Sequence, residues 1–238
     1  MSSFVKRYQA LYRLQDEVIQ FIKAELEDFY LTGGTALDRY YLHHRFSEDL
    51  DFFTHNSSDF ASKLSVIQHK LNDRFELDDA LSLYTESFAR FYIIGHPGLK
   101  LEFICETAKQ WGVSNHFEGL SIDNPGNILA NKLCCIMGRD EPKDVFDIVS
   151  LAEAYSFNWQ QVFRQTASKQ IVDETDIVIR ISQFPVEWLN GVQWQRSEIS
   201  ITDIKHKLSI IAKDFLLAKD NSLGCGKPHI IEARIEHS

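Results

Sequence analysis

Two aspartates, Asp49 and Asp51, lie one residue apart inside an apolar run, in the stretch LTGGTALDRYYLHHRFSEDLDFF at residues 31–53. Residues 49–54 alternate polar and apolar side chains, a pattern that predicts a β-strand. Because successive strand side chains project to opposite faces, the two carboxylates share one face, about 6.6 Å apart along the strand. Carboxylates this close repel each other unless a cation lies between them, and Mg²⁺ prefers such oxygen ligands. The spacing therefore predicts a metal site.

The glycine pair Gly33–Gly34 strengthens the interpretation of the two acids as part of a binding site. Alone, Asp-x-Asp also fits two aspartates on the solvated face of an edge strand. Here the glycines fall between a predicted strand at 29–32 and a predicted helix at 35–44, where Thr35 and Asp38 resemble a capping box. Residues without a Cβ let backbone N–H groups approach a phosphate at a helix N-terminus. The order of strand, glycines, helix and acidic strand predicts a phosphate and metal site.

A third acid, Glu102, lies in the strand-like stretch LKLEFIC at 99–105. Alternation places Glu102 on the face opposite the leucines of this run. The turn signal GHPG at 95–98 predicts that 90–95 and 99–105 form a hairpin. On a strand beside the aspartates, Glu102 would be a third metal ligand or a catalytic acid. An exposed glutamate paired with a cross-strand lysine is the other interpretation.

A lysine, Lys132, interrupts the apolar stripe of the helix predicted at 126–138, and Arg139 falls near the same line. Such a cation is either aimed at a nucleotide phosphate or snorkels, with its stem covering apolar surface. In the next predicted helix, at 143–155, Asp144 sits at the edge of the apolar stripe. Its place in the first turn also suits a plain N-terminal role, since an acid there is favoured by the helix dipole.

An α+β half followed by a helical half must position these groups. Helices are predicted at 4–27 and 58–74, strands at 29–32, 49–54, 81–87, 90–95 and 99–105, and further helices at 126–138, 143–155, 158–170, 173–183 and 200–219. We divide the chain into an α+β core with its N-terminal helix at 1–124, a helical region completing the active site at 125–220, and a tail at 221–238. The turn signals of the tail predict a loosely held segment.

The composition is that of an ordinary soluble globular protein, with 44% apolar and 25% charged residues. No stretch approaches the roughly 18 apolar residues of a membrane span, and the N-terminus lacks the apolar core of a signal peptide. The four cysteines form no CxxC pair and no disulfide framework, so we expect a cytoplasmic protein with no membrane partner. The net charge of −9 argues against a broad nucleic-acid-binding face, so any RNA contact must be local or metal-mediated.

Three separated stretches resemble, in order, the motifs of the AbiEii/AbiGii-type nucleotidyltransferase family: LTGGTAL, HRFSEDLDFF and NKLCCIMGRDEPKDVFDIVSL. The resemblance covers about residues 30–155. It implies a nucleotidyltransferase fold, in which a mixed sheet carries the glycines and the DxD at one edge and is backed by helices. It also implies Mg²⁺-dependent transfer of a nucleotide from an NTP to an acceptor hydroxyl. Because the best-known members are toxins of toxin–antitoxin and phage-defence pairs, a tRNA acceptor end and a cognate antitoxin are the partners to expect.

The resemblance also implies roles for single residues. Ser47, Asp49 and Asp51 match the family's SxDxD pattern, and Asp144 matches the acid of its KD motif. With Glu102 added from the strand pattern, the expected metal ligands are Asp49, Asp51 and Glu102, and the expected catalytic acids are these three and Asp144. The expected nucleotide-binding set is Gly33, Gly34, Thr35, Ser47, Arg45, Lys132 and Arg139. Some members carry a basic residue where this chain has Thr35.

A non-catalytic nucleotide-binding or interaction module on the same fold is the alternative function, because a fold does not fix an activity. The chain keeps both aspartates and Lys132, whereas a degenerate member would usually have lost one of them. This combination favours the enzyme. In it, attack on the α-phosphorus would release pyrophosphate, and Asp144 or Glu102 would deprotonate the acceptor hydroxyl or complete the metal site.

Overall fold

The computed structural model describes residues 3–235 and forms two compact units. The first, which we call the sheet unit, comprises Met1–Ala36, Phe46–Thr107 and Ser114–Ile122. The second, the helical unit, comprises Leu37–Arg45, Ala108–Val113 and Asp123–Ser238. The predicted division is a single boundary between residues 124 and 125, whereas each observed unit is assembled from three separate segments of the chain. Residues 37–45 and 108–113 group with the later helices.

A seven-stranded mixed sheet organises the sheet unit, in the order β3-β4-β5-β2-β1-β7-β6. β1 is antiparallel to β2 and parallel to β7, and β2 is parallel to β5. β4 and β5 are antiparallel, so the predicted hairpin is confirmed. The strands are β1 (Tyr30–Thr32), β2 (Leu50–Thr54), β3 (Leu83–Tyr84), β4 (Phe88–Ile93), β5 (Leu99–Cys105), β6 (Asn115–Phe117) and β7 (Leu120–Ile122). The predicted mixed sheet with flanking helices is confirmed.

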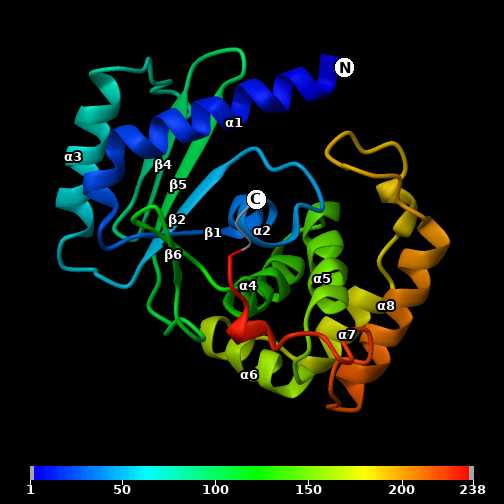
Figure 1. Ribbon diagram of the computed structural model, residues 1–238. Coiled ribbons are helices and arrows are strands. Elements are labelled where there is room, and N and C mark those ends of the chain that lie inside the picture. Colours follow the sequence, from blue (N-terminus) through cyan, green and yellow to red (C-terminus); the bar gives the residue numbers. More distant parts are fainter. Residues whose placement is uncertain (1–2, 236–238) are drawn as a thin grey trace. The chain divides into compact units, whose positions relative to one another are not determined.

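The apolar face of this sheet packs beneath two helices, α1 (Ser3–Ile22) and α3 (Phe60–Asn72), which also contact each other (Figure 1). Phe52 on β2 stacks on Phe103 of β5 with 5.2 Å between ring centroids, and Phe29 lies between Phe103 and Phe60 of α3. All four rings are buried. Because strand side chains alternate, this packing turns the neighbouring polar residues of β2 and β5 to the opposite face.

The longer helices of the helical unit lie close to the ranges predicted: α4 (Pro125–Gly138), α5 (Pro142–Ala154), α6 (Trp159–Lys169), α7 (Glu174–Ser182) and α8 (Ile201–Leu216). α4 packs against α5, α6 and α7, while α8 packs against α5 and α7. Asn124 caps α4 by accepting a hydrogen bond from the Asn127 N–H at 3.0 Å. Over the described range 3–235, no helix combines the length and the apolar character needed to cross a bilayer.

The helix predicted at 35–44 begins earlier and is irregular. α2 (Gly33–Leu37) starts at the first glycine and continues as a π-helix at Asp38–Leu42. Thr35 therefore lies inside the helix, where its hydroxyl donates to the Asp49 carbonyl. The Asp38 carboxylate accepts from Arg196 at 2.9 Å. The capping-box interpretation is wrong, because both side chains have partners distant in the sequence.

The predicted tail at 221–238 is packed against the helical unit as far as residue 235, where the described residues end. The Ser156 N–H donates to the Pro228 carbonyl at 2.9 Å, and the Ile230 N–H donates back to the Ser156 carbonyl at 3.1 Å. Asn221 and Ile230 are buried. The expectation of a loosely held tail is therefore wrong for 221–235, and its last three residues lie outside the described range. The glycines there mark tight turns in a packed segment.

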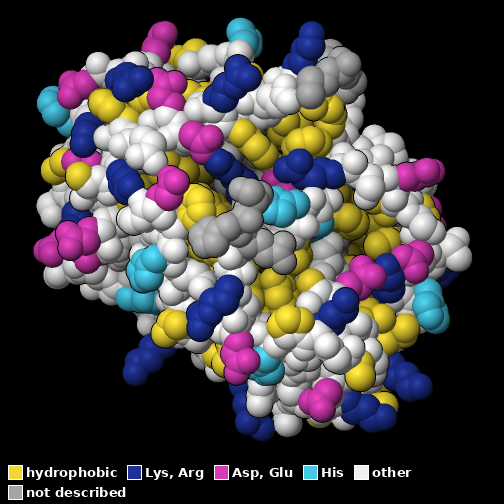
Figure 2. Space-filling view, viewed as in Figure 1, with side chains coloured by type: hydrophobic (Ala, Val, Ile, Leu, Met, Phe, Trp, Pro, Cys, Tyr) yellow, Lys and Arg dark blue, Asp and Glu magenta, His cyan; other side chains and the backbone are white. Residues whose placement is uncertain are grey.

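Charges of both signs are interspersed on the face of the molecule shown in Figure 2. Lysine and arginine side chains alternate there with aspartate and glutamate, and apolar side chains lie between them. This face carries no continuous basic stripe.

Candidate active site

Asp51 lies on an interior strand of the sheet, and Asp49 directly precedes that strand. β2 is hydrogen-bonded to β1 on one side and to β5 on the other, so the edge-strand interpretation of Asp49 and Asp51 is wrong. Asp51 lies within the strand, opposite Thr32 of β1 and Glu102 of β5. Asp49 precedes Leu50, the first residue of the strand. The prediction that Glu102 stands on a neighbouring strand is confirmed.

Gly33 lets the Asp51 carboxylate lie against the start of α2. Gly33 follows β1 directly and has a φ of 70°, a conformation that side chains disfavour. A Cβ at this position would overlap an Asp51 carboxylate oxygen. Gly34 comes next, in the first turn of α2, where backbone N–H groups have no partner within the helix. The glycine pair thus places donors of a helix start close to an acid.

Lys100 lies among the three acids of the sheet unit. Its Nζ is 3.1 Å from Asp49 Oδ2 and 3.1 Å from Glu102 Oε2. Burial lowers the pKa of Lys100, but Asp49, Glu102 and Asp51 raise it, and the net shift is upward. Burial raises the pKa of Glu102, whereas Lys100 and Arg90 lower it, so that the net shift is downward. Lys100 and Glu102 are therefore both charged at neutral pH.

Glu102 has a cation on each oxygen. Arg90 of β4 lies across the strand pair, with its Nη2 2.6 Å from Glu102 Oε1, and Lys100 is on the same strand as Glu102. The side chain of Glu102 is 15% exposed. The alternative of an exposed glutamate with a cross-strand lysine is therefore wrong, because the glutamate is largely buried and its cross-strand partner is an arginine.

The sheet unit offers oxygen donors that suit a hard divalent cation. Asp49 is 43% exposed at its side chain, and Asp51 is opposed by Gly33, which leaves room for its carboxylate. Within residues 3–235, no three His, Cys, Asp or Glu side chains converge closely enough to hold a metal by themselves. Mg²⁺ is commonly bound by one or two carboxylates together with water and substrate phosphates. Asp49 and Asp51 fit that requirement, while both oxygens of Glu102 already face cations.

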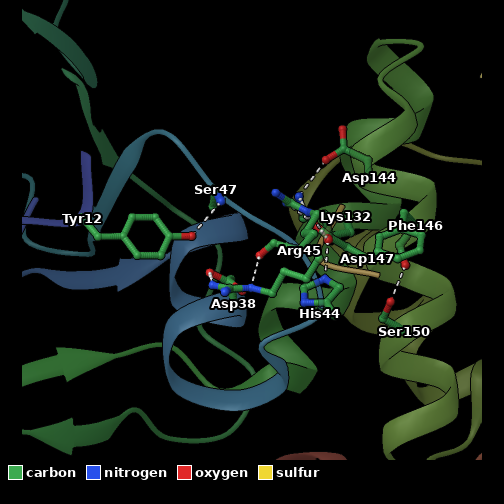
Figure 3. Close-up of polar contacts among 11 residues, drawn as sticks. Tyr12, Asp38, His44, Arg45, Ser47, Lys132, Asp144, Phe146, Asp147 and Ser150 are labelled. Atoms are coloured by element: carbon green, nitrogen blue, oxygen red, sulfur yellow. Dashed lines mark hydrogen bonds and ion pairs between the residues drawn. The ribbon is translucent and has the colours of Figure 1, made fainter. Parts of the chain in front are cut away.

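A second charged cluster lies in the helical unit and is buried (Figure 3). Lys132 Nζ is 2.7 Å from Asp144 Oδ1 and 2.7 Å from Asp147 Oδ2. Arg45 pairs with Asp147 through two bonds, Nε–Oδ1 at 2.6 Å and Nη2–Oδ2 at 2.7 Å. We call these four residues the buried quartet. Its two cations and two anions balance, and this balance is what makes burial of charge tolerable.

Mutual pairing keeps the buried quartet ionised. Burial lowers the pKa of Lys132, but Asp147 and Asp144 raise it, and the net shift is upward. Burial raises the pKa of Asp147, yet Arg45 and Lys132 bring it well below its usual range. The Lys132 side chain is only 8% exposed. The snorkelling interpretation is wrong, because the ammonium lies between buried carboxylates and does not reach water.

Asp144 connects the buried quartet to a more exposed arginine. Arg139 Nε lies 2.7 Å from Asp144 Oδ2, and the Arg139 side chain is 58% exposed. Asp144 falls in the first turn of α5, as predicted, so the helix dipole also favours its charge. The interaction with the helix dipole is not its only role, because the Asp144 carboxylate also accepts hydrogen bonds from Lys132 and Arg139.

Sequence reasoning did not select Asp147 or His44. His44 Nε2 lies 2.7 Å from Asp147 Oδ1, and its ring stacks on Phe146. Burial lowers the pKa of His44 despite the opposing effect of Asp147, so the neutral ring donates its Nε2–H to the carboxylate. Asp147 follows Asp144 by three residues on the same helix, and this spacing could have drawn attention to it. Nothing local marks His44.

The predicted site residues thus form two clusters, one in each unit. Gly33, Gly34, Asp49, Asp51 and Glu102 belong to the sheet unit, and Arg45, Lys132, Arg139 and Asp144 belong to the helical unit. Thr35 and Ser47 are buried and contact the backbone or a neighbouring helix. The Thr35 hydroxyl donates to the Asp49 carbonyl, and the Ser47 N–H donates to the Tyr12 hydroxyl at 3.1 Å.

Comparison with solved structures finds the same fold in several proteins. A candidate nucleotidyltransferase from H. pylori has 24% identity and a TM-score of 0.58, covering 84% of this chain and 92% of that one. JHP933 from Helicobacter pylori has 22% identity and a TM-score of 0.54, covering 84% and 89%. MenT4, a nucleotidyltransferase toxin from Mycobacterium tuberculosis H37Rv, has 14% identity and a TM-score of 0.59, covering 91% and 86%. No curated protein matches.

A family model described as nucleotidyl transferase AbiEii toxin, of the type IV toxin–antitoxin system, matches residues 22–187. This range includes the glycine pair, both aspartates and the lysine of α4. It takes in more than half of the chain and both of its charged clusters. The chain therefore belongs to the AbiEii family of nucleotidyltransferase toxins and is a nucleotidyltransferase.

Proposed function

We propose that the protein transfers a nucleotide from an NTP to an acceptor hydroxyl in a Mg²⁺-dependent reaction. The acceptor we propose is the end of a tRNA, and the biological role is that of the toxin in a toxin–antitoxin or phage-defence pair, with a cognate antitoxin as partner. The observation that carries the proposal is that Asp51 lies opposite Glu102 of the adjacent strand and against Gly33, with Asp49 directly before the same strand. Carboxylates beside a glycine-rich helix start suit a metal-bound triphosphate.

In this proposal Asp49 and Asp51 hold Mg²⁺. When bound, the ion supplies positive charge that polarises the transferred phosphoryl group and stabilises the attacking and leaving oxygens. The backbone N–H groups of Gly33 and Gly34 bind phosphate oxygens. Glu102 keeps Lys100 and Arg90 in place, and Lys100 neutralises part of the acidic charge until the metal and substrate arrive.

Glu102 and Asp144 act through charge in this proposal and do not remove the acceptor proton. Burial raises the pKa of Asp144, but Lys132 and Arg139 lower it, and the net shift is downward. The pKa of Glu102 is also lowered. A general base works best with a pKa near the working pH, so two carboxylates held by cations are poor proton acceptors. Asp144 instead keeps the Lys132 and Arg139 cations charged and oriented.

The cations of the helical unit differ in how accessible they are to a phosphate. The Arg139 side chain is more than half exposed, so its guanidinium is accessible to a phosphate. An ammonium has three N–H donors, and the carboxylates of Asp144 and Asp147 account for two of those on Lys132. Arg45 is 2% exposed and bidentate to Asp147, so we propose that it positions the quartet and does not touch the nucleotide.

An RNA acceptor would have to be contacted locally. The net charge of −9 and the mixed charges in Figure 2 do not support an extended phosphate-binding face. We propose that contact is confined to the RNA end that carries the hydroxyl. A short acceptor-end mimic is then expected to serve as a substrate in place of a whole tRNA.

The test is to incubate the protein with each labelled NTP, with and without Mg²⁺, using tRNA, acceptor-end mimics and protein as acceptors. The proposal expects label on the RNA end, release of pyrophosphate and complete loss of transfer when EDTA removes the metal. Label on protein, together with unlabelled RNA, would show that the acceptor is a protein and not an RNA end. Transfer at an undiminished rate in EDTA would reject the metal requirement.

A further inference from the structure

Asp49 lies outside the sheet, so the sheet alone does not fix its carboxylate. Residues 46–49 belong to no strand or helix, and the hydrogen-bonded strand begins at Leu50. Ser47 in this loop is buried. Buried backbone N–H and C=O groups require partners, because an unsatisfied one is costly. The partners of this loop therefore decide where Asp49 stands relative to Asp51.

Side chains of α1 supply those partners. Gln15 Nε2 donates to the Glu48 carbonyl at 3.2 Å, with the Ser47 carbonyl at 3.5 Å. The Ser47 N–H donates to the Tyr12 hydroxyl at 3.1 Å, as Figure 3 shows. These contacts are made to the two residues immediately before Asp49. The loop backbone is bonded to a helix more than 30 residues away in the sequence.

Gln15 is an unusual residue for its place in α1. It is 0% exposed and occupies the buried stripe of the helix between Leu11 and Val18. A buried amide is tolerated only where hydrogen bonds replace those it made to water. An apolar side chain would be the ordinary choice for this stripe. The position is therefore explained by the carbonyls that the amide reaches.

The side chains of the loop are held by the same helix. The Phe46 ring stacks on Tyr8 with 4.3 Å between centroids and an interplanar angle of 15°, and it meets Phe4 edge-on at 5.7 Å. The Glu48 carboxylate accepts from the Tyr8 hydroxyl at 2.9 Å and pairs with Arg7 at 3.0 Å. Every residue from Phe46 to Glu48 thus contacts α1.

On the other side of the loop, the Thr35 hydroxyl of α2 donates to the carbonyl of Asp49 itself. Asp49 is therefore held from two directions, by α2 at its own carbonyl and by α1 at the preceding peptide. Asp51 is fixed independently by the ladders to β1 and β5.

We infer that α1 is a positioning element of the active site, and that Gln15 and Tyr12 set the separation of the Asp49 and Asp51 carboxylates. The inference rests on the proposed function of these two acids as metal ligands. α1 spans Ser3–Ile22, whereas the family match begins at residue 22. The positioning role therefore belongs to a part of the chain outside that match.

The test compares Gln15→Met, which keeps the side-chain length but removes the hydrogen bonds, with Gln20→Met on the exposed side of the same helix. Tyr12→Phe removes only the hydroxyl that accepts from Ser47. We expect Gln15→Met and Tyr12→Phe each to weaken Mn²⁺ binding, measured by electron paramagnetic resonance, by about tenfold, the equivalent of one or two hydrogen bonds. The Mg²⁺ concentration for half-maximal transfer should rise by the same factor, with KM for NTP at saturating metal unchanged. Gln20→Met should match the wild type.

A helix that merely packs on the sheet predicts a different result. Gln15→Met would then be as stable as the wild type or more so, and Mn²⁺ affinity would be unchanged in both variants, which would overturn the inference. Should Gln15→Met fail to fold, Tyr12→Phe decides by the same measurement. Asp51→Asn distinguishes a failure of the positioning role of α1 from a failure of the proposed metal site. If this variant binds Mn²⁺ and transfers as the wild type does, the metal site itself is rejected.

Discussion

The acidic cluster of the sheet unit and the buried quartet of the helical unit differ in how cations balance their closely spaced carboxylates. Around β2, Asp49, Asp51 and Glu102 lie together with Lys100 and Arg90, so this cluster contains three acids and two cations. In the quartet, Asp144 and Asp147 are matched by Lys132 and Arg45. The cluster around β2 is the more accessible one, since the Asp49 side chain is 43% exposed and that of Lys132 is 8% exposed.

This difference separates a site that can accept a further cation from one that cannot. An accessible cluster of neighbouring carboxylates gains by binding Mg²⁺. A buried, neutral cluster has nothing to gain from another ion, and the loss of any one member leaves an uncompensated charge in the interior. We therefore expect the first cluster to control transfer and the second to control folding stability.

Lys132→Met should give the largest effect and should appear in stability. Removing the ammonium leaves Asp144 and Asp147 with fewer partners, and breaking a buried ion pair costs about 3–5 kcal/mol. Urea denaturation measures the loss, with Lys205→Met on the exposed side of α8 as the control. Undiminished stability together with reduced NTP affinity would show instead that Lys132 is a phosphate ligand with no structural role.

Asp51→Asn should give the converse result, with transfer lost and the fold retained. We expect the rate to fall on the order of 10²- to 10³-fold, the usual cost of removing one preorganised electrostatic contact. The melting temperature should hold or rise slightly, because one of three neighbouring acids has been neutralised. Asp176→Asn, at an exposed position of α7, is the control for the substitution itself. A normal transfer rate in Asp51→Asn would contradict the assignment.

Lys100→Met sharpens the comparison by making the acidic cluster more negative. Without this ammonium the apo protein should melt at a lower temperature, because Asp49 and Glu102 lose a cation at 3.1 Å. Mg²⁺ should then bind about tenfold more tightly, an assumed gain of about 1.4 kcal/mol, and should restore the melting temperature. Thermal melts with and without Mg²⁺ test this, with Lys205→Met, at the exposed position on α8, as control. Equal stabilisation of both variants by Mg²⁺ would count against Lys100 as a counter-ion of the metal site.

The smallest effect concerns His44 and pH. Burial lowers its pKa below the ordinary 6.5 despite the hydrogen bond to Asp147. The unfolded chain takes up this proton near pH 6.5 while the folded protein does not, so stability is lost as pH falls below 6.5 toward the lower folded pKa. His44→Gln, which keeps a donor for Asp147, should flatten this part of the profile of unfolding free energy between pH 7.5 and 5. His206→Gln, at an exposed site on α8, should leave the slope unchanged.

Local sequence patterns determined much of the sheet unit. The alternation of residues 49–54 and 99–105 correctly separated the acids from Phe52 and Phe103, because a strand has only two faces. The turn at 95–98 set the β4–β5 hairpin, and the periodicity after Pro125 located the five helices of the helical unit. The glycine pair indicated a close approach without indicating that Asp51 would be the neighbour.

Tertiary structure alone decided which charges meet. Arg45 and Asp147 are 102 residues apart, and no local pattern carries information on such a pair. A lysine in an apolar helix stripe has the same sequence signature whether it snorkels or joins a buried ion pair, and only the packing of α4 against α5 distinguishes them. Gln15 likewise resembles one polar residue among others on α1 until the loop before Asp49 is folded against it. The sequence specified the chemical groups, whereas their partners and their burial followed from contacts between distant segments.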